Sequence, residues 1–295
     1  MPETADILKK IRRLELRTRR LVETAFAGQY HSVFKGRGMN FEDVRAYNPG
    51  DEVRFIDRNV TARTGDLHVK NFTEERELTV VLAVDVSASG GFGSVEQSKR
   101  ELAAEVASLL AFSAIGNRDK VGLILFSDEV ELFLPPRKGR SHVLRLVREV
   151  LYHRPRGRRT SVAAALEFLN KVITRRAVVF LLSDFQSPDF SRPLAVTARR
   201  HDLVAVPVVD PLEETLPDVG RVSLEDAETG SILEVNTSDG RVRAGFAQAV
   251  EARRGALDGL LRRAGVDAIT LRTDADYLPA LRAFFQQRER RIARR

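Results

Sequence analysis

Two nearly continuous apolar runs, each ended by an aspartate, constrain the fold of this chain most strongly. The run LTVVLAV precedes Asp85, and the run AVVFLLS precedes Asp184. Strands this apolar must be covered on both faces, which is typical of parallel sheets flanked by helices. Segments with helical periodicity separate them from further strands such as KVGLILFS and DLVAVPVVD. The sequence therefore predicts an α/β fold, a Rossmann-like and mainly parallel sheet with helices on both faces.

The predicted sheet occupies only the later part of the chain. We assign residues 76–295 to the α/β domain, with a hairpin insertion near residues 211–236, where turn-rich sequence contains two short strands. An amphipathic helix is expected over residues 5–26, followed by a loop-rich or small β-element up to about residue 70. Aromatic and aliphatic side chains in that element indicate a folded segment and not a linker. Residues 1–75 therefore form an expected N-terminal arm.

Composition excludes several classes of protein. The 295 residues contain no cysteine, which removes disulfides, thiolate catalysis and cysteine-based zinc sites. No transmembrane segment is expected, because no apolar run is long enough to cross a bilayer. The first residues are charged where a signal peptide would be apolar, so a cytoplasmic location is expected.

The formal net charge is +7, and the basic excess lies mainly in the end segments KKIRRLELRTRR and RERRIARR. Such a balance permits binding to nucleic acid or to an anionic membrane surface. Solvated helix faces explain the same residues more simply. A basic factor associated with nucleic acid or a membrane surface is therefore the alternative reading, and nucleic acid is not the favoured partner.

The glycine-rich stretch DVSASGGFGS, from Asp85 to Ser94, follows the first apolar strand. A dinucleotide loop would need a third glycine where Glu96 stands, and its carboxylate would repel a pyrophosphate. A polar turn that caps the next helix is another alternative, with Ser94 the best-placed cap. The residues Asp85, Ser87 and Ser89 alternate, so in an extended loop their oxygens face one point.

Oxygen atoms of carboxylates and hydroxyls suit a hard cation, Mg²⁺ or Mn²⁺, better than zinc. The predicted position, outside the carboxyl ends of the strands, is where open α/β sheets hold ligands. Two further oxygens are available from separate loops. Thr160 stands at the start of a later helix, and Asp184 ends a later strand.

This arrangement resembles the metal-ion-dependent adhesion site of von Willebrand factor A domains. The segments FEDVRAYNPGDEVRFIDRNVTAR, TEERELTVVLAVDVSAS and VVDPLEETLPDVGRVSLEDAETG are similar to the bacterial family called domain of unknown function fifty-eight, over about residues 36–290. The resemblance implies a von Willebrand factor A-like domain and a MoxR-type AAA+ ATPase as partner, engaged through an acidic residue. It also implies Mg²⁺ or Mn²⁺ ligands at Asp85, Ser87, Ser89, Thr160 and Asp184.

The implied function is a metal-dependent protein-interaction adaptor and not an enzyme. A phosphatase-like hydrolase is disfavoured, because such enzymes place a second carboxylate where this chain has Ser87. No other pairing of a nucleophile with a base is visible. In the arm, four charged residues are either an ion-pair network that locks the arm to the body or a functional surface: Asp51, Arg54, Asp57 and Arg63.

Overall fold

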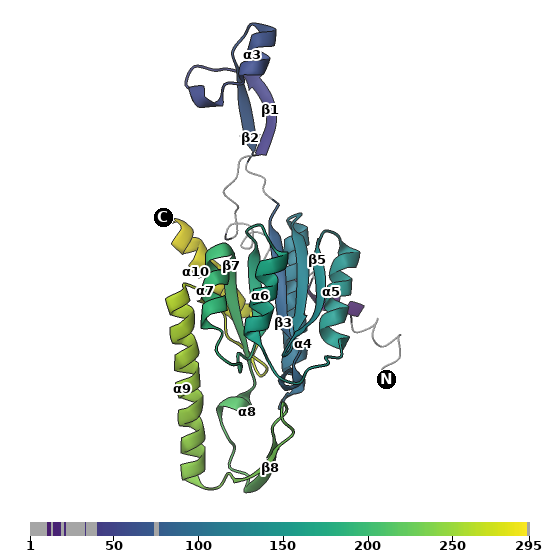
Figure 1. Cartoon of the computed structure of the whole chain (residues 1–295), viewed down its shortest axis with the longest axis vertical. Helices are drawn as coiled ribbons and strands as arrows, with labels where there is room; N and C mark the ends of the chain where they lie inside the picture. The colour runs from purple at the N-terminus through teal and green to yellow at the C-terminus, as the bar shows by residue number, and fades with distance from the viewer. Residues whose placement is uncertain are drawn as a thin grey trace. The chain divides into compact units, whose positions relative to one another are not determined.

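The computed structural model describes residues 11, 12, 14–18, 21, 33, 40–73 and 77–293. Its contacts divide the chain into two compact units (Figure 1). One unit is Phe34–Leu78, and the other combines Met1–Val33 with Thr79–Arg295.

This division differs from the sequence-based one, which joined residues 1–75 into one arm. Ile11 and Leu14 are buried, and Glu15 forms an ion pair with Arg140 of the α/β unit. These contacts explain why the start of the chain groups with the α/β unit. Most of the helix predicted over residues 5–26 lies outside the described residues, but those that are described there are helical.

The α/β unit contains a central sheet in which six strands follow one another in space. Their order is β10 (Asp267–Ala268), β7 (Asp202–Val209), β6 (Val178–Ser183), β3 (Thr79–Asp85), β4 (Lys120–Phe126) and β5 (Val130–Arg137), with β11 (Leu271–Arg272) also on β7. All pairs are parallel except β4 with β5. From β3 the chain adds β4 and β5 on one side of the sheet, and from β6 it adds β7 and β10 on the other side. The carboxyl ends of β3 and β6 therefore meet at a topological switch point.

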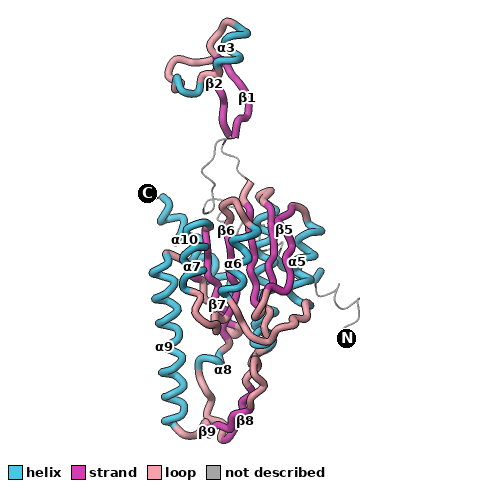
Figure 2. Tube along the Cα trace, viewed as in Figure 1, coloured by secondary structure: helices cyan, strands magenta, loops and turns pink. Residues whose placement is uncertain are grey.

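Helices cover both faces of this sheet (Figure 2). On one face, α6 (Val162–Val172), α7 (Ser191–Arg200) and α9 (Gly240–Ala264) share a buried cluster with the strands. On the other, α4 (Lys99–Gly116) packs against α5 (Arg140–Tyr152), and Tyr277 of α10 (Tyr277–Ala293) hydrogen-bonds Glu105 of α4. The predicted α/β architecture, a sheet of mainly parallel strands between two helical layers, is confirmed.

None of the helices in the described part of the chain is long and apolar enough to cross a membrane.

The sheet edges also differ from its centre. Strand β5 is the last strand on its side and carries Pro135 and Pro136, with Pro136 packed against Gly122 of β4.

The helix that follows the glycine-rich stretch begins with a capping box. The Ser98 hydroxyl accepts from the Glu101 N–H, and the Glu101 carboxylate accepts from the Ser98 N–H. The alternative in which Ser94 caps this helix is therefore wrong, since Ser94 lies four residues before the cap. The cap places Lys99 in the first turn of α4, directed at the end of the sheet.

Two smaller elements complete the structure. After β7 come α8 (Pro211–Glu214) and an antiparallel hairpin of β8 (Arg221–Glu225) and β9 (Ile232–Asn236). The separate unit pairs β1 (Asn40–Ala46) antiparallel to β2 (His68–Thr73), joined by the 3-10 turn η2 (Val53–Phe55) and by α3 (Arg58–Thr64).

Candidate functional site

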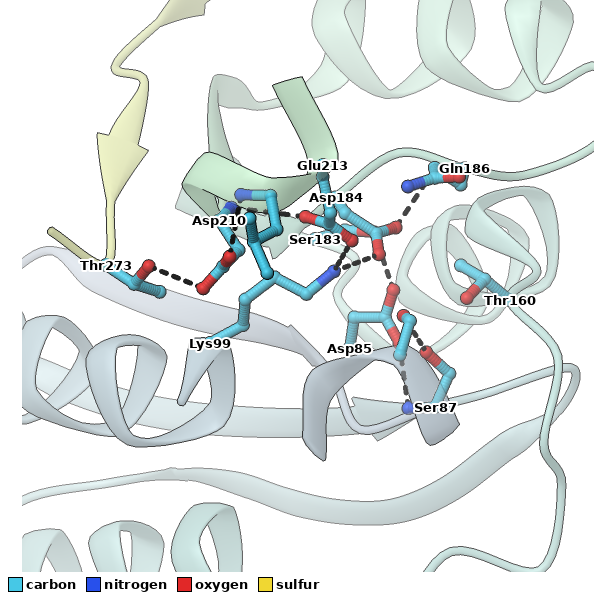
Figure 3. Close-up of polar contacts among 12 residues, drawn as sticks. Asp85, Ser87, Lys99, Thr160, Ser183, Asp184, Gln186, Asp210, Glu213 and Thr273 are labelled. Carbon is cyan, nitrogen blue, oxygen red and sulfur yellow. Dashed lines mark hydrogen bonds and ion pairs between the residues drawn. The ribbon is translucent and has the colours of Figure 1, made fainter. Parts of the chain in front are cut away.

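A small cavity of about 20 Å³ lies where β3 and β6 end, at the switch point of the sheet. Asp85 is the last residue of β3, and Asp184 directly follows β6. Both carboxylates line the cavity together with Ser89 and Lys99. Figure 3 shows Asp85, Asp184 and Lys99 close to one another. The two apolar runs of the sequence thus end at one point in space.

The carboxylate of Asp85 is buried and held by hydroxyl and amide donors. One oxygen accepts from the Ser87 N–H at 2.9 Å, and the other accepts from the Ser183 hydroxyl at 2.6 Å. Burial raises the pKa of Asp85 to about 6, and repulsion from Asp184 acts in the same direction. A cation close to this carboxylate would stabilise its charged form.

The two serines of the D-x-S-x-S pattern meet beside Asp85. Their hydroxyl oxygens are 3.1 Å apart, and the Ser89 hydroxyl also bonds Asp184. The backbone that brings them together is not the predicted extended loop. Residues Ala88–Gly91 form the 3-10 turn η3, so a tight turn and not strand-like alternation places both hydroxyls on one side.

Asp184 holds a buried ammonium group that the sequence did not suggest. The Lys99 Nζ atom lies 2.8 Å from a carboxylate oxygen of Asp184 and 2.6 Å from one of Glu213 in α8. The Lys99 side chain is only 4% exposed. Burial raises the pKa of Asp184, but the charge and hydrogen bond of Lys99, together with the Gln186 N–H and the Ser89 hydroxyl, lower it overall. Burial likewise lowers the pKa of Lys99, yet its two carboxylate partners raise it overall, so Lys99 stays charged.

A third aspartate, Asp210, fixes the loop that surrounds the cavity. It follows β7, is fully buried and accepts four hydrogen bonds. Two come from the N–H and hydroxyl of Ser94, at 2.9 and 2.5 Å, and the others from the Leu212 N–H and the Thr273 hydroxyl. The same signal that marked Asp85, an apolar strand ended by an aspartate, was present at Asp210 and was missed.

Thr160 lies on a separate loop, and in the view of Figure 3 it stands on the other side of Asp85 from Lys99. The Ala88 N–H donates to the Arg158 carbonyl at 3.0 Å, which ties this loop to the serine turn. The buried Thr160 hydroxyl donates to Glu228 of the β8–β9 turn at 3.2 Å. The structure therefore connects Asp85, Ser87, Ser89 and Asp184 directly, whereas Thr160 reaches them through its loop.

The Thr160 loop is held rigidly against the turn between β4 and β5. The Glu131 carboxylate accepts from the N–H groups of Arg156 and Gly157 at 2.9 and 3.0 Å. A Cβ atom at Gly157 would lie 1.4 Å from a carboxylate oxygen of Asp128. A larger residue at this position would have to push the Asp128 and Ser127 side chains aside, so the loop that carries Thr160 packs closely against this turn.

These residues fit a hard divalent cation. The donors are carboxylate and hydroxyl oxygens, the set that Mg²⁺ and Mn²⁺ prefer. The ammonium of Lys99 also lines this pocket and pairs with Asp184, so a bound ion would share that carboxylate with it. No group of three or more histidine, aspartate or glutamate side chains able to hold a metal occurs among the described residues. An ion here would therefore depend on the serine and threonine hydroxyls.

The charged residues proposed as an arm network do not form one network. Asp51 accepts two hydrogen bonds from the Arg45 guanidinium, both at 2.7 Å. Asp57 caps α3 and lies 3.7 Å from Lys70. These contacts lie within the unit and close in sequence, because a tight turn and a helix start each bring their own donors to the carboxylate.

The two arginines of that set are on the surface. Arg54 pairs with Glu52 and lies over the ring of Phe55 at 4.8 Å. Arg63 is exposed on α3 and forms no ion pair within the described residues. The four residues therefore have separate local roles.

Part of the basic charge at the C-terminal end is neutralised by the α/β unit. Arg288 pairs with Asp202 and, at 3.2 Å, with Asp267. Arg291 lies 2.8 Å from Asp267. These pairs leave less free positive charge for nucleic acid or a membrane surface than the sequence alone indicated.

Comparisons with known proteins give a consistent family match. The family model "Protein of unknown function DUF58" matches residues 43–256. Uncharacterized protein Rv1480 of Mycobacterium tuberculosis (strain ATCC 25618 / H37Rv) is 35% identical over 283 residues, which cover 95% of this chain and 89% of that protein. Uncharacterized protein MAV169 of Mycobacterium avium is 37% identical over 160 residues, 53% of this chain and 94% of that protein.

Two solved structures are also similar to this chain. The conserved hypothetical protein BatB from Bacteroides thetaiotaomicron aligns with a TM-score of 0.47 and 17% identity, over 74% of this chain and all of that one. The SpRpn10 VWA domain aligns with a TM-score of 0.38 and 9% identity, over 70% of this chain and 94% of that one.

Proposed function

This chain belongs to the Protein of unknown function DUF58 family, and from this premise we propose that it is a protein-interaction adaptor that depends on Mg²⁺ or Mn²⁺. One observation carries the proposal. Asp85, Ser87, Ser89 and Asp184 are joined by hydrogen bonds at the carboxyl end of the sheet, and Thr160 lies on the adjoining loop. A bound divalent ion would supply positive charge that attracts an acidic side chain of another protein.

The chain's own residues have distinct tasks in this proposal. The Ser87 N–H and the Ser183 hydroxyl orient the Asp85 carboxylate. Lys99 keeps Asp184 charged in spite of burial. Asp210 holds the site loop through Ser94. The result is a pocket of fixed oxygen atoms that needs no large rearrangement to receive a cation.

The surface around the site suits a protein partner. Phe92 and Val95 of the site loop are 41% and 42% exposed, and Leu212 of α8 is 40% exposed. Exposed apolar side chains next to a charged pocket are common at protein–protein contacts. The family resemblance indicates a MoxR-type AAA+ ATPase, which would present the acidic residue. We further propose that the role is not catalytic, since a hydroxyl, Ser87, stands where a phosphatase of this sheet type has its second carboxylate.

Calorimetric titration with Mg²⁺ and Mn²⁺ tests the ion site. Asp85→Ala should abolish binding, because it removes a central carboxylate, whereas Asp258→Ala on the exposed surface of α9 should bind as the wild type does. Equal metal affinity of Asp85→Ala and the wild type would overturn the proposal.

A pull-down with a MoxR-type ATPase tests the partner. Binding should be lost in EDTA and restored by Mg²⁺, with little dependence on salt. Binding that survives EDTA but falls steeply with rising salt would instead support the basic-surface alternative.

A further inference from the structure

The hairpin between α8 and α9 places a carboxylate on the ion site from a distant part of the sequence. The Glu228 carboxylate accepts from the Thr160 hydroxyl at 3.2 Å, although the two residues are 68 positions apart. Thr160 is buried, and Glu228 is partly buried. The hydroxyl gives its proton to Glu228, so its oxygen lone pairs stay available to an ion, and the carboxylate is held next to that oxygen.

The turn that carries Glu228 is ordered by its own hydrogen bonds. The Asp226 carboxylate accepts from the N–H groups of Glu228 and Thr229 at 2.8 and 3.0 Å. Gly230 closes the turn with a φ of 71°, a conformation that favours glycine. The Glu228 side chain is therefore presented by a preorganised turn and not by a loose loop.

Polar contacts, and not a hydrophobic core, hold this turn to the body. The Arg158 guanidinium donates to the Ala227 carbonyl at 3.0 Å, next to the Thr160–Glu228 bond. In the strands behind the turn, Ile232 and Leu233 are 70% and 65% exposed. The hairpin thus docks mainly through its tip.

Negative charge gathers at this point. The Glu228 carboxylate is repelled by the charges of Asp184 and Asp226, and Arg159 offsets part of this repulsion. The ammonium of Lys99 is already engaged by Asp184 and Glu213. A divalent ion between the Thr160 loop and Asp184 would offset this repulsion.

We propose that Glu228 is an internal ligand of the ion site, which fills in cis the coordination position otherwise open to a partner's acidic residue. The inference rests on the proposed function, because it requires that Asp85, Ser87, Ser89, Thr160 and Asp184 hold an ion. It makes the β8–β9 hairpin a lid. A partner that presents an acidic side chain has to displace Glu228, and a partner that binds the exposed hairpin strands would help to open the site.

Mn²⁺ binding to the full chain tests this assignment. Glu228→Gln keeps the shape and a weak acceptor but removes the negative charge. We expect it to weaken Mn²⁺ binding about tenfold or more. It should also raise the water-proton relaxation rate of bound Mn²⁺, because a water molecule takes the place of the carboxylate. Glu225→Gln, on the exposed side of the same hairpin, is the matched control and should change neither value.

Acetate then serves as a probe for the partner's carboxylate. With Glu228→Gln, acetate should displace the additional water and lower the relaxation rate at a lower concentration than with the wild type. Wild-type protein that binds Mn²⁺ while Glu228→Gln matches it in affinity and relaxation would overturn the internal ligand and leave the ion site standing. Failure of the wild type to bind Mn²⁺ at all would overturn both proposals.

Discussion

An ion pair of the Phe34–Leu78 unit and an ion pair of the α/β unit differ in both sequence separation and burial. In the Phe34–Leu78 unit, Arg45 pairs with Asp51 six residues away, and the Arg45 side chain is 42% exposed. At the end of the central sheet, Lys99 pairs with Glu213 at a separation of 114 residues, and its side chain is 4% exposed. The first kind of pair follows from a local turn. The second exists only when the whole sheet has formed.

This difference separates charges that shape a surface from charges that set up a site. Exposed ion pairs contribute little to stability, because water and salt screen them. A buried ammonium between carboxylates loses its hydration, and apolar residues of similar volume would often be at least as stable. The buried group at the switch point is therefore better explained by the pocket that it maintains than by the stability that it adds.

The largest expected effect comes from Lys99→Met. It leaves the Asp184 and Glu213 carboxylates facing each other without a cation, which should lower the free energy of unfolding by about 3–5 kcal/mol. Mn²⁺ should restore part of this loss, because it supplies the missing positive charge. Urea unfolding with and without Mn²⁺ measures both effects.

Glu213→Gln is the matched control for that experiment. It leaves the Lys99–Asp184 pair in place, so its effect should be smaller and insensitive to Mn²⁺. The Lys99→Met/Glu213→Gln double variant should lose less stability than the two single variants lose together. In the double variant, the missing ammonium leaves only the Asp184 carboxylate unpaired, because Glu213 has become a neutral amide. A Lys99→Met protein as stable as the wild type would contradict the claim that the buried Lys99 pairs matter more for stability than the exposed Arg45–Asp51 pair.

Asp210→Ala should follow in size. It leaves the buried Thr273 hydroxyl without its acceptor and releases the site loop at the exposed Ser94, at a cost of about 1–3 kcal/mol. Thr273→Val removes a single donor and should cost clearly less. Urea unfolding of both variants, together with Mn²⁺ titration, shows whether the loop that Asp210 holds also determines ion affinity; unchanged values for Asp210→Ala would contradict its anchoring role.

A buried histidine outside the site should make the stability of the α/β unit depend on pH. His201 is buried at the end of α7, and burial, followed by repulsion from Arg200 and Arg176, lowers its pKa to about 4. In the unfolded chain His201 therefore takes up a proton near pH 6.5, whereas in the folded chain it takes one up only near pH 4. Stability should be complete above pH 6.5 and fall between pH 6.5 and 4, by at most about 1.4 kcal/mol per pH unit. Unfolding of the wild type and His201→Gln over this range measures the difference; parallel curves would contradict it.

The smallest effect is expected in the other unit. Arg45→Ala removes an exposed guanidinium from Asp51, and the turn is still closed by the Asn48 N–H on the same carboxylate. The unfolding midpoint should stay at the wild-type value, as measured by thermal unfolding at low and high salt. A large loss of stability at low salt would show that this pair does more than a surface contact does.

The sequence was sufficient for the framework of the site. Asp85 and Asp184 were predicted because apolar strands that end on a charged residue place it at the edge of a sheet, whatever the loops do. Ser87 and Ser89 followed from their spacing, although a 3-10 turn and not an extended loop brings them together. Short-range patterns thus determined which residues gather at the switch point.

Residues that depend on the paths of long connections could not be predicted in this way. Lys99 reaches Asp184 only because a capping box at Ser98 sets the start of α4. Glu228 reaches Thr160 only because the hairpin folds back over 68 residues. Neither has a local signal in the sequence. The ion-pair network predicted for the arm does not form, because Asp51 and Asp57 find their hydrogen-bond donors close by in the sequence and not in distant parts of the chain.

The two edges of the central sheet restrict how other chains can attach to this protein. Strand β5 bears Pro135 and Pro136, which have no N–H to offer to an added strand, and β10 on the other side is only two residues long. Such edges resist β-augmentation and edge-to-edge aggregation. A partner strand would therefore find few backbone groups to pair with at either edge of this sheet.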